Sequence, residues 1–125
     1  MMLARWRGHE SQVNERATLL QLIAAIEATG EPTLLSLVAE NAAILSVGLG
    51  APETIVLLEE GAEDAFHSLG DPDRGGVLQF YGWHNEPDDF FADAAIPAAH
   101  AIPSLLSFWD SGGKRPDGIT WESDF

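Results

Sequence analysis

The sequence contains no cysteine, few basic residues and no long run of apolar residues. Without cysteine, the 125-residue chain can form neither a disulfide nor a metal site built on thiolates. No apolar stretch approaches the roughly 20 residues of a membrane-spanning helix, and the N-terminus lacks the basic-then-apolar pattern of a signal peptide. These absences predict a cytoplasmic protein that does not span a membrane.

Basic residues are scarce because only six Lys and Arg oppose 20 Asp and Glu, which gives a net charge of −14. Eleven of the acids lie between Glu53 and Asp93, where Arg74 is the only base, so this segment alone carries a charge of −10. Binding of phosphate needs clustered Lys and Arg, so the composition argues against nucleic acid and anionic membranes as ligands. A basic protein partner or a cation fits the charge.

The length and the apolar pattern predict one domain over residues 1–125. Leu19, Leu22, Ile23 and Ile26 recur at helical spacing, and a second helix carries the same spacing from Ile102 to Trp109. Strand-like runs occupy residues 2–8, 33–39, 43–49, 54–58, 77–83 and 118–122, and residues 84–93 read as an acidic loop. We expect an α+β fold, in which a mostly antiparallel β-sheet is packed by an N-terminal and a C-terminal helix.

Catalytic motifs are incomplete in this sequence. His84-Asn85-Glu86 resembles the His-x-Glu of zinc deaminases, but that site needs cysteine ligands that the chain lacks. Residues 71–76 resemble the start of a calcium loop, yet glycine occupies both later ligand positions, at 75 and 82. There is no nucleophile elbow and no phosphate-binding loop with a lysine. We therefore predict no catalytic, cofactor-binding or metal residues.

Aromatic residues next to carboxylates are the strongest candidates for a binding surface. Phe90 and Phe91 directly follow Asp88 and Asp89, and aromatics rimmed by carboxylates make a good anchor for a basic protein surface. The acids and aromatics predicted to contact a partner are Glu59, Glu60, Glu63, Asp64, Trp83, His84, Glu86, Asp88, Asp89, Phe90 and Phe91.

Several short strings occur in a familiar order along the chain. They are PTLLSL at residues 32–37, ILSVGLG at 44–50, SLGD at 68–71, AIP at 95–97, GGKRP at 112–116 and ITW at 119–121. This series resembles the Imm1 family of bacterial immunity proteins, small cytoplasmic inhibitors that protect a producer from its own polymorphic toxins. The likeness extends roughly from Leu19 to Trp121.

The resemblance implies a non-catalytic protein that binds and neutralises a cognate toxin domain, and members are associated with deaminase and nuclease toxins among others. A toxin that acts on nucleic acid presents a basic substrate groove, which an acidic protein can occlude. Two alternatives remain open from the residues alone. One is a small acidic adaptor unrelated to toxins, and the other is a metal-dependent hydrolase built on His84, Glu86, Asp88 and Asp89.

Overall fold

The computed structural model describes residues 1–124, and over this range the protein is mostly antiparallel β-sheet, with 40% strand and 23% helix. The chain starts with β1 (Met2–Trp6), β2 (His9–Val13) and α1 (Arg16–Ala28). Next come β3 (Thr33–Val38), β4 (Ile44–Leu49), β5 (Glu53–Thr54), β6 (Val56–Gly61), β7 (Asp64–Ser68), β8 (Val77–Tyr81) and β9 (Pro87–Phe91). The last elements are η1 (Ala92–Ala94), β10 (Ile96–Pro97), η2 (Ala98–His100), α2 (Ala101–Asp110) and β11 (Trp121–Ser123).

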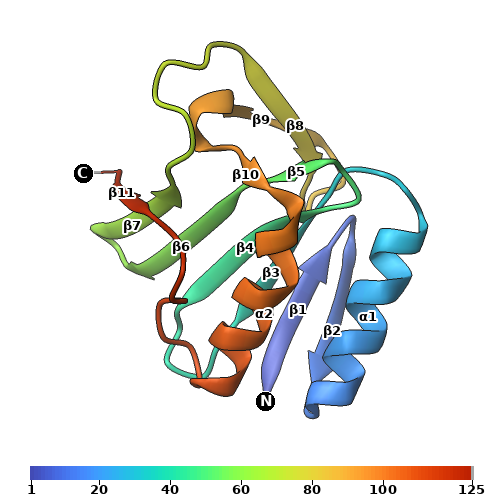
Figure 1. Cartoon of the computed structure of the whole chain (residues 1–125). Helices are drawn as coiled ribbons and strands as arrows, with labels where there is room; N and C mark the ends of the chain where they lie inside the picture. Colours follow the sequence, from blue (N-terminus) through green and yellow to red (C-terminus); the bar gives the residue numbers. More distant parts are fainter. Residues whose placement is uncertain (125) are drawn as a thin grey trace.

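The main sheet has the strand order β11-β7-β6-β4-β3-β1-β2, with antiparallel neighbours throughout. The hairpin β8–β9 branches from this path, because β8 pairs in parallel with β3 only at Thr33 and Tyr81. It rises above the main sheet at the top of Figure 1. The short strands β5 and β10 form a separate pair.

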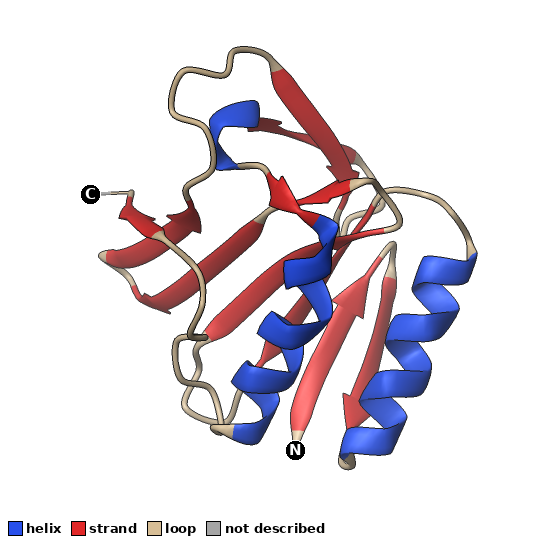
Figure 2. Ribbon diagram, in the orientation of Figure 1, coloured by secondary structure: helices blue, strands red, loops and turns tan. Residues whose placement is uncertain are grey.

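The expected fold class, a sheet packed by an N-terminal and a C-terminal helix, is wrong. The hairpin β1–β2 precedes α1, and α2 is followed by β11, which pairs with β7 at the edge of the sheet. Strands therefore stand near both ends of the chain, and the antiparallel sheet is the main element of the fold (Figure 2). The sequence pattern does not predict β2, because only Val13 in this strand is buried and the strand shows no apolar alternation.

The first core lies on one face of the sheet and follows from the alternation in β3 and β4. Leu35 and Leu37 of β3 share this core with Leu45 and Val47 of β4, and all four side chains are fully buried. Because successive strand residues point to opposite faces, the residues between them belong to the other side of the sheet. The helices contribute Leu19, Ile23, Ile26, Leu105 and Phe108 to the same core.

A second, smaller core lies on the opposite face and attaches the hairpin β8–β9. Phe80 of β8 is 1% exposed and packs with Leu34, Ile55 and Ala94. Its ring occupies the space above Gly48 of β4, where a Cβ would lie only 2.5 Å from Phe80 Cε1. The absence of a side chain at residue 48 therefore lets the hairpin approach the sheet.

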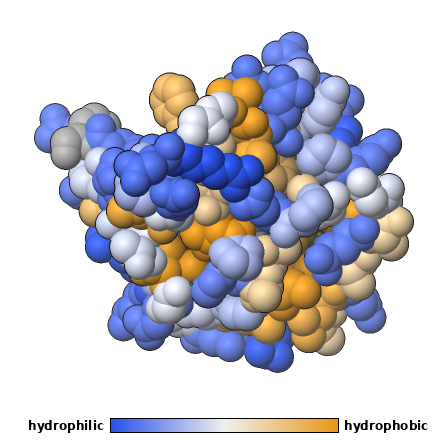
Figure 3. Space-filling model, turned by 45° about the horizontal axis from the view of Figure 1, so that its top comes forward, coloured by the Kyte–Doolittle hydropathy of each residue, from blue (hydrophilic) through white to orange (hydrophobic). Residues whose placement is uncertain are grey.

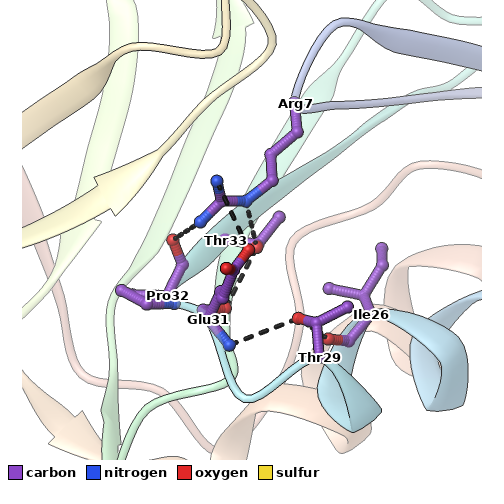
Figure 4. A network of polar contacts seen from close by, with 6 residues as sticks. All are labelled: Arg7, Ile26, Thr29, Glu31, Pro32 and Thr33. Atoms are coloured by element: carbon purple, nitrogen blue, oxygen red, sulfur yellow. Dashed lines mark hydrogen bonds and ion pairs between the residues drawn. The ribbon is translucent and has the colours of Figure 1, made fainter.

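A second attachment of the β8–β9 hairpin runs through Arg7, in the turn between β1 and β2. Figure 4 shows Arg7 with Glu31, Pro32 and Thr33. Arg7 Nε donates to Thr33 Oγ1 at 2.8 Å, and Arg7 Nη2 donates to the carbonyl oxygen of Pro32 at 3.2 Å. Glu31 forms an ion pair with the same guanidinium at 3.7 Å. The guanidinium also lies over the Tyr81 ring, 4.3 Å from its centroid, so one arginine links the β1–β2 turn, β3 and β8.

The contact between Gly48 and Phe80 gives a stability prediction. We expect Gly48→Ala to lower the free energy of unfolding by about 1–3 kcal/mol, because the added methyl overlaps a buried ring that has no free space. Urea unfolding measures this change. Gly75→Ala is the matched control, since nothing lies within 4 Å of a Cβ added there. Equal stability of the two variants would contradict the packing described.

Candidate functional site

The hairpin β8–β9 carries most of the predicted partner-binding residues. Trp83, His84 and Glu86 lie in its turn, whereas Asp88, Asp89, Phe90 and Phe91 lie in β9 itself. The expected acidic loop over residues 84–93 is therefore wrong from Pro87 onward. Proline and aspartate have low strand propensity, and β9 forms because it pairs with β8 from Val77 to Tyr81.

The two phenylalanines of β9 point in opposite directions. Phe90 is half-buried and packs on the second core, with its ring centroid 6.4 Å from that of Phe80. Phe91 is 78% exposed and lies opposite Val77, which is 54% exposed. The strand alternation thus gives the hairpin one face bound to the sheet and one outer face with an exposed apolar pair.

The turn of the β8–β9 hairpin is held by β1 and by the turn that follows β1. Gly8 N donates to the carbonyl oxygen of Trp83 at 2.7 Å, and the Arg5 guanidinium lies 4.1 Å from the centroid of the Trp83 indole. Trp83 therefore supports the hairpin and still exposes part of its ring. His84 and Glu86 next to it are exposed.

The other predicted residues, Glu59, Glu60, Glu63 and Asp64, lie around the β6–β7 turn and are exposed. Glu60 accepts a hydrogen bond of 2.6 Å from Arg115 Nη2, so its charge is compensated. The structure thus divides the predicted set between two hairpins.

A groove of about 520 Å³, which we call the β9–β11 groove, lies between β9 and the end of the main sheet at β11. It is lined by Leu57, His67, Asp89, Phe90, Phe91, Asp93, Ala94, Glu122, Ser123 and Asp124. Asp89, Phe90 and Phe91 were predicted as binding residues, whereas His67, Glu122 and Asp124 were missed. The pairing of β7 with β11, which places Glu122 opposite His67, brings them here, and no local sequence signal reveals that pairing.

His67 lies among the carboxylates of the groove. Its Nδ1 hydrogen-bonds Asp124, and its Nε2 lies 3.6 Å from a carboxylate oxygen of Glu122. Asp89 accepts a hydrogen bond of 2.8 Å from Gln79 Nε2 but forms no ion pair within residues 1–124. With Asp93 also in the lining, the groove is strongly acidic.

The arginines of the chain do not neutralise this region, because each is paired elsewhere. The pairs are Arg5–Glu10, Arg7–Glu31, Arg16–Asp110, Arg74–Glu53 and Arg115–Glu60. Arg74, the one base of the acidic segment, hydrogen-bonds Glu53 at 2.6 Å and lowers the pKa of that carboxyl. The surface drawn in Figure 3 mixes hydrophilic side chains with open hydrophobic patches.

Within residues 1–124, no three His, Asp or Glu side chains are grouped so that they could hold a metal ion. His84, Glu86, Asp88 and Asp89 therefore do not form the metal cluster that a hydrolase would need. None of the helices in the described range is long and apolar enough to cross a membrane.

The family is decided by a comparison with known proteins. The family model described as immunity protein Imm1 matches residues 3–123, nearly the whole chain. The chain belongs to the Imm1 family. No curated protein matches it. The resemblance noted in the sequence is confirmed, and membership indicates an immunity function directed at a toxin.

The strings that carry the Imm1 resemblance lie in the scaffold. Two of them form β3 and β4, and GGKRP follows α2. Gly113 is buried at φ 105°, and a Cβ there would lie 2.6 Å from the Cβ of Ala39. Trp121 Nε1 donates to the carbonyl oxygen of Pro116 at 3.4 Å. These positions fix the fold of the Imm1 domain, and the β9–β11 groove is built mainly from other residues.

The pair of Arg74 and Glu53 gives a pH prediction. Since the folded-state pKa of Glu53 is lowered, the pair's contribution to stability is complete above the ordinary pKa of glutamate and is lost as the pH falls through the lowered value. We expect the stability difference between wild type and Glu53→Gln in urea unfolding to shrink on acidification. Glu63→Gln, which removes a carboxyl that forms no ion pair within residues 1–124, is the control. A difference for Glu53→Gln that does not change with pH would refute the assignment.

Proposed function

We propose that this chain neutralises a nucleic-acid-targeting toxin domain, a deaminase or a nuclease, by covering the toxin's basic substrate site. The surface of the β8–β9 hairpin supports this proposal. Asp88, Asp89 and Phe91 are exposed there, and neither aspartate forms an ion pair within residues 1–124. Carboxylates on this hairpin occupy the positions where substrate phosphates would bind. Phe91 supplies the apolar contact at the centre.

The same charge makes the chain a poor ligand for nucleic acid itself. At −14, it repels phosphate and attracts a cationic protein surface. Inhibition of this kind needs only occupancy of the toxin site, so the chain acts in stoichiometric amounts and without catalysis. It acts in the cytoplasm, where a producer's own nucleic acid is exposed to the toxin.

Affinity capture from the source organism, washed across a salt gradient and read by mass spectrometry, tests the function. We expect a basic toxin domain at a near one-to-one ratio. Deletion of the gene should then make a strain that expresses this toxin poison itself. If an ordinary cellular protein is recovered and deletion is harmless, the chain is an adaptor and the proposal is wrong.

Charge reversal on β9 tests the surface. We expect Asp88→Lys/Asp89→Lys to slow association with the captured toxin by roughly tenfold or more and to weaken its salt dependence, because steering comes from these carboxylates. Stopped-flow or surface-plasmon kinetics at two ionic strengths measure both effects.

The matched control is Glu27→Lys/Asp117→Lys, which makes the same change of net charge at two exposed acids outside the hairpin. If net charge alone controls association, both variants will associate equally slowly. That result, or unchanged association kinetics for the β9 variant, would show that the hairpin is not part of the interface.

A further inference from the structure

The β9–β11 groove runs along the edge of β9. Asp89, Phe90 and Phe91 are consecutive in this strand, and consecutive strand residues point to opposite faces. All three can line one groove only if the groove follows the side of the strand. Within residues 1–124, β9 pairs with β8 alone, so this side carries no neighbouring strand.

The opposite wall of the groove is formed by the end of the main sheet. Glu122 and Ser123 of β11 line it together with Asp124, and β11 is the last strand in the order of the sheet. The floor is apolar in part, because Leu57 of β6 lies in the groove opposite its register partner His67. The groove is therefore a channel between two strand edges with an apolar base and acidic walls.

We propose that the β9–β11 groove receives an extended, basic segment of the toxin, which adds a strand to the open edge of β9. The main chain of this segment pairs with β9, its cationic side chains meet Asp89, Asp93 and Glu122, and its apolar side chains pack on Phe91. This inference rests on the proposed function and specifies how the partner is recognised.

The acidic charge of the groove and the open edge of β9 together favour an extended, basic segment. A helix offers no main-chain donors or acceptors to an open strand edge, because its own backbone uses them. A second copy of this chain is opposed by charge, since β9 and the groove are both acidic and the chain carries −14. A segment that is both extended and basic satisfies both requirements.

A titration of the full-length ¹⁵N-labelled chain tests the docking mode. The probe is a synthetic peptide of alternating arginine and valine, and the control peptide has the same sequence with every peptide nitrogen methylated, so that it keeps the charge but cannot pair as a strand. We expect amide shifts confined to residues 88–91 and 122–124 and slowed amide exchange in β9 with the first peptide only. Equal binding of both peptides, or shifts centred on the β6–β7 turn, would overturn the inference.

Variants in the chain separate the anchor from general charge. We expect Phe91→Ala to weaken binding of the alternating peptide by roughly tenfold, as for a central aromatic anchor. Leu20→Ala, which shortens an apolar residue 38% exposed on α1, should have no effect. Equal affinities of the two variants would remove Phe91 from the contact.

Growth protection by the wild-type chain keeps the two proposals distinguishable. A chain that protects cells from its toxin but does not bind the peptide along β9 retains the proposed function and loses this docking mode. A chain that fails to protect against the toxin it captures loses the proposed function, whatever the peptide shows.

Discussion

The packing of Phe80 on Gly48 is the contact that holds the β8–β9 hairpin on the second face of the sheet. The hairpin β8–β9 joins the main sheet by strand pairing at only one residue pair, Thr33 and Tyr81, so backbone hydrogen bonds alone hold it weakly. The buried ring of Phe80 supplies a strong further attachment, and a glycine beneath it makes the close approach possible. Because β9 pairs with β8, this contact also sets the position of Asp88, Asp89 and Phe91.

Arg7 complements that contact at the other end of the hairpin. Its guanidinium reaches Pro32 and Thr33 (Figure 4). Its backbone N–H donates to the carbonyl oxygen of Gly82 at 3.1 Å. The hairpin is thus fixed at its turn and along its length before any partner arrives. A surface ordered in advance loses less conformational entropy on binding, which favours rapid and tight capture by an inhibitor.

The sequence predicted the elements that bury their own apolar residues and missed those that depend on a neighbour. The strands at residues 33–38 and 44–49 and both long helices show clear apolar periodicity. In contrast, β2 buries only Val13, and β9 contains Pro87 and two aspartates, so their pairing with β1 and β8 is a tertiary effect. The same reason explains the candidate site, where Phe90 and Phe91 were found but His67 and Asp124 were not. At the start of the chain β1 was predicted but its partner β2 was not, so the hairpin that precedes α1 was not recognised.

We propose that the β8–β9 hairpin and the groove beside it hold the toxin. Amide hydrogen exchange of the full chain, compared between the free protein and its complex with the captured toxin domain, tests this directly. We expect new protection concentrated in residues 87–93 and 122–124, with α1 and β2 unchanged. Protection confined to α1, β2 or the β6–β7 turn would contradict it.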